Sequence, residues 1–172
     1  MKEWYESQTE NRGHVNYFGI YATLPIGNDL YMGFGSARPA EQDGAYFAKF
    51  DGFTLTGIGE PDEQGFHEMI YDGALIHIAG TDPRDDHTAG THYTYSPDHN
   101  SFTKYRNPAH GLVNVYHTWG LWYAGSTLYA AVGAHDGHDD CNVHACMGQI
   151  FSSTDSGLTW QKKKRSGDVS RL

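Results

Sequence analysis

The sequence predicts an all-β fold made of repeated four-stranded antiparallel sheets, and three observations lead to that prediction. The chain has 172 residues, of which 38% are hydrophobic and 19% charged, so a folded core is expected. Aromatic residues make up 14% of the chain and 21 residues are glycine, a combination typical of strands joined by tight turns. A pattern of leucine followed five residues later by glycine, with an apolar or aromatic run between them, occurs three times, at residues 30–35, 75–80 and 128–133. The leucines are 45 and 53 residues apart, which is the spacing of one β-propeller blade per repeat.

The surroundings of each match also recur. Each leucine is preceded by an apolar-aromatic run and turn residues, and each glycine is followed by a polar loop, a third strand, a short turn and a fourth strand. The first strands are expected at 17–24, 66–71 and 113–123, the third at 45–50, 91–96 and 149–153, and the fourth at 53–56, 102–106 and 159–163. Asn-Asp, Asp-Gly and Gly-Ser pairs between first and second strands are typical of hairpins. We therefore expect a single partial propeller domain over residues 1–172, with blades at about 14–57, 66–107 and 113–165 and with residues 1–10 as a fourth strand of a neighbouring blade.

Charge and hydropathy exclude several classes of partner. The formal net charge of −9 argues against binding to nucleic acid or to an anionic membrane surface, which requires basic surface. No apolar stretch approaches the ~20 residues of a membrane span, and the first residues lack the apolar core of a secretory signal. The protein is expected either in the cytoplasm or, by a route that uses no such signal, in a virion or outside the cell. The basic run 162–165 is interpreted as a solvated edge strand or tail, with a partner contact as the alternative.

One turn carries a family resemblance. The segment Ser153-Thr154-Asp155-Ser156-Gly157-Leu158-Thr159-Trp160 resembles the Asp-box, the bacterial neuraminidase (BNR) repeat of sialidase-like β-propellers. In such a turn the Asp carboxylate accepts backbone N–H bonds, the glycine takes a positive φ, and the tryptophan packs between blades. Residues 96–100 are a weaker copy with Asn100 in place of glycine, and residues 50–53 are a shortened remnant. The residues assigned to the box are Ser153, Asp155, Gly157, Thr159 and Trp160.

The resemblance implies a propeller more strongly than it implies an enzyme. The box has a structural role in that family and faces away from the substrate side. Sialidases of the family use an arginine triad and an Arg-Ile-Pro segment, and this chain has no Arg-Ile-Pro and only six arginines. Three blades are too few to close a ring, so we expect a homo-oligomer, most simply a two-fold dimer of six blades. A larger assembly such as a virion, or origin as a piece of a longer parent, are the alternatives.

The loops between second and third strands gather ionisable residues on one rim. These loops are expected at 36–44, 81–90 and 134–148, beside the blade-to-blade loops at 57–66 and 107–112. The candidate ligand-binding residues of this rim are Arg38, Glu41, Asp82, Arg84, Asp85, Asp86, His87, Asp139 and Asp140. Three interpretations remain open: a solvated acidic surface, a Ca²⁺ site from the aspartates, or paired carboxylates that act as acid and base on a glycoside.

The third of these loops is the longest and contains a cluster of His and Cys. A zinc or other transition-metal site could use His135, His138, Cys141, His144 and Cys146, which are suitable ligand types. A Cys141–Cys146 disulfide and two free thiols are the competing interpretations.

Four aromatic residues, Tyr116, Trp119, Trp122 and Tyr123, are expected in the blade core. Alternation along a strand places Trp119 and Trp122 on opposite faces, so one of them could instead turn towards the axis as a platform for a sugar ring. Taken together, the sequence favours a non-catalytic propeller module for structure or recognition on a particle or cell surface, with glycans as the expected ligand. The alternatives are a glycosidase or sialidase-like hydrolase with a site between subunits, and a metal-dependent hydrolase.

Overall fold

A computed structural model of the chain describes residues 18–36, 45–59, 63–81, 89–106, 111–134 and 147–163. These residues form twelve strands and no helix. The strands are β1 (Phe18–Ile26), β2 (Asp29–Ser36), β3 (Tyr46–Phe50), β4 (Leu55–Gly59), β5 (Gly65–Tyr71), β6 (Ile76–Thr81), β7 (His92–Ser96), β8 (Ser101–Tyr105), β9 (Val115–Ala124), β10 (Thr127–Ala134), β11 (Met147–Ser153) and β12 (Gln161–Lys162). The prediction of an all-β fold is confirmed, and a search of the described residues finds no helix that could span a membrane.

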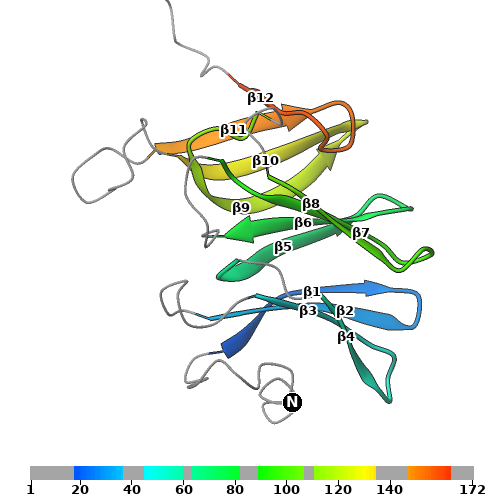
Figure 1. Cartoon of the computed structure of the whole chain (residues 1–172). Coiled ribbons are helices and arrows are strands. Elements are labelled where there is room, and N and C mark those ends of the chain that lie inside the picture. Colours follow the sequence, from blue (N-terminus) through cyan, green and yellow to red (C-terminus); the bar gives the residue numbers. More distant parts are fainter. Residues whose placement is uncertain are drawn as a thin grey trace, which may run out of the picture.

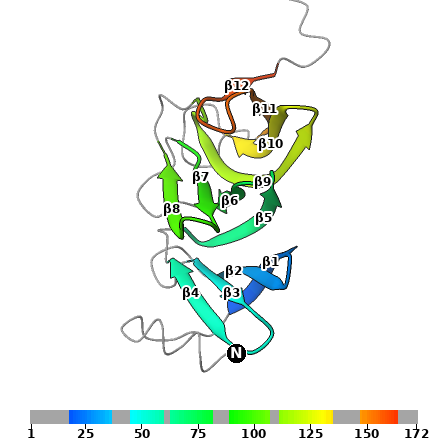
Figure 2. The ribbon, with the colours of Figure 1, turned by 90° about the vertical axis from the view of Figure 1, so that its right-hand side faces the viewer.

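The strands form three successive antiparallel units of four. Blade 1 has the order β1-β2-β3-β4, blade 2 pairs β5, β6, β7 and β8 in order, and blade 3 pairs β9, β10, β11 and β12. Among the described residues, backbone pairing joins blades 2 and 3 at Thr81 with His117 and at Ala89 with Val113. The three blades are stacked one on the next, and β1 contacts β5, which contacts β9 (Figure 1). Figure 2 shows β1 and β5 on one side of this stack and β4 and β8 on the other. The first strand of each blade is therefore the innermost one.

Each blade has two ends with different connections. The turns of hairpins β1–β2, β3–β4 and β7–β8 lie at the right of Figure 1, where Gly27, with φ of 60°, and Asn100, with φ of 48°, take the left-handed backbone that such turns require. At the opposite end, the last residue of each second strand lies near the start of the first, as in the pairs Phe18–Ser36 and Gly65–Thr81. The predicted acidic loops begin at this second end, which we call the loop rim.

Apolar clusters fill both junctions between blades. We call the face of a blade towards the preceding blade its back face, and the other its front face. The front face of blade 1 packs against the back face of blade 2 through aromatic contacts, such as Phe47 with Tyr95 at 5.3 Å between ring centroids and an angle of 77°. The front face of blade 2 meets Leu128, Phe151 and Trp160 on the back face of blade 3. This burial is the main force that holds the blades together.

The repeat itself needs one correction. Leu30 and Leu128 lie within β2 and β10 on the back faces of their blades, but Leu75 precedes β6, and the equivalent back-face residue is Ile76. The reason is the hairpin: the turn before β6 holds four residues, between Tyr71 and Ile76, whereas the matching turns of blades 1 and 3 hold two. Since side chains alternate along a strand, the match at Leu75 was wrong by one residue, which inverts every face assignment in β6.

Candidate functional site

The sequence-predicted site residues lie outside the described part of the chain. This holds for all nine ligand-binding rim residues, Arg38, Glu41, Asp82, Arg84, Asp85, Asp86, His87, Asp139 and Asp140, and for the five metal ligands, His135, His138, Cys141, His144 and Cys146. Within the described ranges, no group of three or more His, Cys, Asp or Glu could hold a metal ion. The first strands, the buried polar groups and the Ser153–Trp160 turn are the parts of the candidate site that the structure describes.

The first strand of every blade carries a β-bulge in its half nearer the loop rim. In β1, Ile20 and Ala22 oppose consecutive residues of β2, so Tyr21 has no partner of its own. In β9 the same shift leaves Trp119 between paired residues. In β5, His67 and Glu68 together oppose one residue of β6. A bulge redirects the side chain of the extra residue, and bulges are common beside binding sites.

The side chains at these bulges contact one another from blade to blade. Tyr21 stacks on His67 with ring centroids 5.2 Å apart, and His67 meets Trp119 edge-on at 5.0 Å. Trp119 also stacks on His117 of its own strand at 4.3 Å. We call Tyr21, His67, Trp119 and His117 the axial aromatic row. Trp119 is 47% exposed, so this row presents an indole ring to solvent.

These positions correct part of the sequence interpretation. Tyr116 is buried and Tyr123 packs against the blade 2–blade 3 cluster, as expected. Trp119 and Trp122, 47% and 40% exposed, are not core residues. The bulge turns Trp119 out of the sheet, and Trp122 lies with Tyr129 on the front face of blade 3, the last of the described blades. A bulge has no sequence signature strong enough to reveal this in advance.

The glycine that ends each repeat makes room for the inner side chains. A Cβ atom on Gly35 would lie 2.7 Å from the ring of Tyr21, and one on Gly133 would lie 3.1 Å from the indole nitrogen of Trp119. In blade 2, a Cβ on Gly80 would lie 2.9 Å from the carboxyl carbon of Glu63. In blades 1 and 3 the sequence pattern therefore records a packing requirement, one large aromatic ring against the glycine, whereas Gly80, which is out of register by one residue, makes room for Glu63 instead.

Glu63 is a buried carboxyl group at the junction of blades 1 and 2. It is 0% exposed and accepts a 2.9 Å hydrogen bond from the hydroxyl of Tyr93, while its backbone oxygen accepts one from Ala45. Burial raises the pKa of Glu63 to about 7, although the hydrogen bond from Tyr93 opposes the shift. Sequence reasoning missed this residue because its partners lie about 30 residues away in the chain.

The Ser153–Trp160 turn has the geometry that its residue types predict. Asp155 Oδ1 accepts hydrogen bonds from the backbone N–H of Thr159 at 2.9 Å and from the Ser153 hydroxyl at 2.6 Å, and Oδ2 accepts from the Thr159 hydroxyl at 2.5 Å. Gly157 has φ of 86° and donates its N–H to Ser153. Trp160 is buried between blades 2 and 3 and meets His92 edge-on at 5.6 Å. The turn thus ties the end of blade 3 to blade 2.

Asp155→Ala should destabilise the fold by about 2 kcal/mol, because it leaves the Ser153 and Thr159 donors without their carboxylate partner. Burial alone raises the pKa of Asp155, but the hydrogen bonds from Ser153 and Thr159 lower it below its ordinary 3.8. This contribution is therefore present above pH 3.8 and is lost as the pH falls. Urea unfolding at pH 7 and pH 3 measures it. Asp51→Ala, which removes a similar but exposed turn cap, is the control and should cost less. Equal effects of the two changes would contradict this role.

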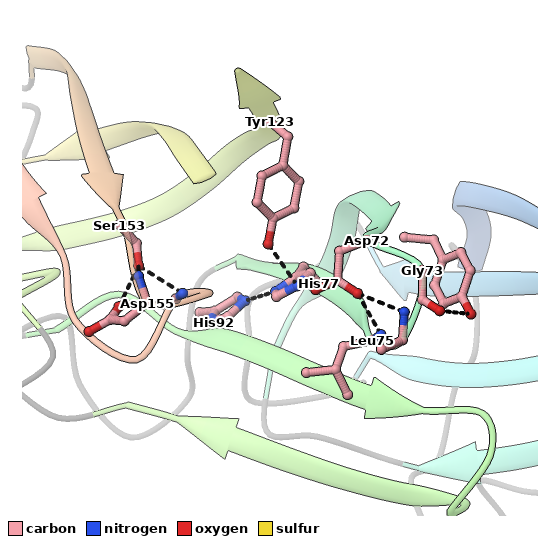
Figure 3. A network of polar contacts seen from close by, with 11 residues as sticks. Asp72, Gly73, Leu75, His77, His92, Tyr123, Ser153 and Asp155 are labelled. Carbon is pink, nitrogen blue, oxygen red and sulfur yellow. Dashed lines mark hydrogen bonds and ion pairs between the residues drawn. The ribbon is translucent and has the colours of Figure 1, made fainter. Parts of the chain in front are cut away.

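A second polar network lies beside this turn, with His77 at its centre (Figure 3). His77 Nε2 lies 2.9 Å from Asp72 Oδ2 and 3.2 Å from the hydroxyl of Tyr123, and His77 Nδ1 lies 3.1 Å from His92 Nε2. Because the Asp72 carboxylate only accepts, His77 Nε2 donates to it, and a neutral His77 then accepts from His92 at Nδ1. Burial raises the pKa of Asp72, but hydrogen bonds from His77, Leu75 and Ala74 outweigh burial and lower it. The network joins three strands and two blades, which identifies it as a structural element of the turn end, the end of the blades opposite the loop rim.

Comparison with solved structures identifies the architecture. The chain is similar to a GH74 enzyme of Niastella koreensis, with a TM-score of 0.55 and 14% identity, over 85% of this chain and 22% of that one. That enzyme is a β-propeller glycoside hydrolase. The fold is that of a β-propeller. The chain spans about a fifth of the length of that enzyme. No protein-family model matches the chain, and no curated protein matches it.

In a propeller the first strands surround the central axis, so the axial aromatic row lies on the axis side of the three blades. The loop rim lies at the same half of these strands. Phe18 and Gly65, which begin β1 and β5, pair with the last residues of β2 and β6. The described residues therefore combine an exposed ring, flanking imidazoles and the starts of the predicted acidic loops at one end of the molecule. The network of His77 and the Ser153–Trp160 turn belong to the other end.

Proposed function

We propose that this chain is a non-catalytic β-propeller module that recognises glycans, working as an oligomer on a particle or cell surface. The single observation that carries the proposal is the exposed indole of Trp119 within the axial aromatic row. The C–H face of a pyranose packs on an aromatic ring, which supplies apolar contact area without requiring a charged ligand. The imidazoles of His67 and His117 lie beside the indole. An imidazole can donate a hydrogen bond to a sugar hydroxyl or accept one from it.

We further propose that the Ser153–Trp160 turn is an Asp-box of the sialidase-like propeller superfamily. The hydrogen bonds of Asp155, the positive φ of Gly157 and the inter-blade packing of Trp160 support this proposal. The acidic loops are proposed to supply polar contacts to the same ligand, because they begin where the second strands end.

Trp119→Ala should weaken binding on a glycan array that displays neutral and sialylated oligosaccharides, with at least a tenfold loss of affinity for any oligosaccharide bound by the wild type. Trp122→Ala is the matched control, because Trp122 lies on the same strand and is similarly exposed but lies outside the axial aromatic row. Binding that survives Trp119→Ala, or a wild type that binds none of the displayed glycans, would refute the proposed function.

A second candidate is a glycoside hydrolase, favoured by the likeness to a GH74 enzyme. It predicts turnover of chromogenic glycosides that disappears in Asp85→Asn or Asp139→Asn. Binding without turnover supports the module instead.

Zinc analysis of the purified protein, repeated on Cys146→Ser, tests the metal-dependent alternative.

A further inference from the structure

Glu63 ties the linker between blades 1 and 2 to both of them. Its backbone oxygen accepts a 2.6 Å hydrogen bond from the N–H of Ala45, the residue before β3 of blade 1. The backbone N–H of the next residue, Gln64, donates to Thr81, the last residue of β6 in blade 2, at 2.9 Å. The side chain adds a third tie, because its carboxyl accepts from Tyr93 of β7. Ala45 and Thr81 border two of the predicted acidic loops, so Glu63 fixes the backbone beside the loop rim.

The carboxyl group of Glu63 is buried with only one of its oxygens satisfied. Oε1 accepts the 2.9 Å bond from Tyr93, whereas Oε2 is buried and has no hydrogen-bond partner among the described residues. The Tyr93 ring stacks on Phe102 and meets Phe66 edge-on, which holds its hydroxyl in place. Beneath the carboxyl, β6 presents Gly80, which has no side chain to offer. A neutral carboxyl tolerates this position, because a charged group is much more costly to bury than a neutral one.

Ionisation of this carboxyl places a charge inside the junction. Besides that tyrosine, the described groups that act on it are Lys104, on β8, and Arg106, just after β8, and both favour the ionised form. Burial outweighs them and raises the pKa of Glu63 to about 7. Access of water relieves the cost of the charge, and the shortest route is to part the two backbone bonds of the linker, at Ala45 and Gln64.

The linker leads directly into the axial aromatic row. Gly65, two residues after Glu63, lies against Tyr21, since a Cβ atom on Gly65 would be 2.8 Å from the Tyr21 ring. The same glycine begins β5, which carries His67, and His67 stacks on Tyr21 and contacts Trp119. A shift of the linker therefore removes the support behind Tyr21 and moves His67 relative to Trp119.

We propose that Glu63 is a positioning residue for the glycan site: its protonated form holds the linker in the described arrangement, and its ionised form releases the linker. The chain then binds its glycan more tightly at acidic than at alkaline pH, although Glu63 does not touch the ligand. By linkage, glycan binding takes up a proton at this carboxyl. The inference rests on the proposed function for its ligand, whereas release of the linker is measured without one.

The pH dependence of glycan affinity tests the coupling. Between pH 5.5 and 8.5, the affinity of the wild type for an oligosaccharide bound on the array should fall at least about fivefold. The limit is about 30-fold, because a group with a pKa of about 7 is protonated in about 3% of molecules at pH 8.5. Glu63→Gln should lose this part of the pH dependence, and Glu68→Gln, which removes a part-buried carboxyl on β5, should keep it. Titration of His67 and His117 is common to all three proteins, so parallel profiles of the wild type and Glu63→Gln would overturn the coupling.

Hydrogen exchange tests release of the linker without any ligand. Between pH 5.5 and 8.5, the protection factors of the Ala45 and Gln64 amides in the wild type should fall about tenfold more than that of Thr159, a turn amide of blade 3. In Glu63→Gln this difference should vanish. Tyr93→Phe removes the donor to the ionised carboxylate, so the fall should move to higher pH.

The two measurements separate the ways in which the inference can fail. Equal exchange profiles in the wild type and Glu63→Gln would overturn the positioning role, whether or not the protein binds a glycan. A wild type that releases its linker as expected but binds no glycan refutes the proposed function and the coupling with it. A wild type that binds glycan without releasing the linker refutes this inference alone.

Discussion

Gly157→Ala is expected to destabilise the folded chain by about 3–5 kcal/mol, the largest single effect at the turn end. Two costs combine: Gly157 has φ of 86°, where a side chain is strained by about 1–3 kcal/mol, and overpacking of a buried site adds about 1–3 kcal/mol. The added Cβ would lie 2.2 Å from the ring of His92. That ring cannot move aside, because it is bound to His77 and packed against Tyr105 and Trp160.

The matched control is Gly125→Ala, which changes a glycine with φ of 60° in a turn where a Cβ would meet nothing within 4 Å. It should cost only the strain of an alanine in a left-handed backbone conformation, about 1–2 kcal/mol. Urea unfolding of the two variants measures the difference, which is mainly the packing cost. Similar losses for Gly125→Ala and Gly157→Ala would mean that the contact with His92 does not matter.

Glu63 should make the fold less stable as the pH rises, by about 3 kcal/mol in total. Its pKa is 4.5 ordinarily and about 7 in the folded chain, so the folded state holds its proton more tightly. A carboxyl with a raised pKa contributes full stability below the unfolded pKa of 4.5, and this contribution is lost as the pH rises through 7. The difference of about 2.5 pKa units, at about 1.4 kcal/mol each, sets the size of the loss.

Glu63→Gln removes the titration while keeping an acceptor for the Tyr93 hydroxyl. The variant should match the wild type near pH 4.5 and exceed its free energy of unfolding by about 3 kcal/mol near pH 8.5. Urea unfolding at several pH values, with Glu68→Gln as a part-buried control, measures this. A wild-type pH profile between 4.5 and 8.5 that parallels that of Glu63→Gln would show that the carboxyl is not destabilised by burial.

The elements that could be predicted are those whose signals lie within a few residues. The hairpins, the apolar runs and the Ser153–Trp160 turn depend on local chemistry, so their positions followed from the residues themselves. The register of blade 2 did not, because the chain between Tyr71 and Ile76 holds two more turn residues than its counterparts and the Leu–Gly spacing conceals this. The sequence allowed one of Trp119 and Trp122 to turn outward but did not decide which, since a bulge is visible only when the partner strand is in place.

The sequence alone determined that the chain is a repeat of antiparallel four-stranded sheets, because alternation and turn residues are encoded locally and are repeated three times. Only the tertiary structure decided which side chains meet. Tyr21 and His67, and His67 and Trp119, are about 50 residues apart in the chain, and His92 and Gly157 are 65 residues apart. Such contacts arise from the stacking of one blade on the next, and no local pattern records the distance between two side chains on different sheets.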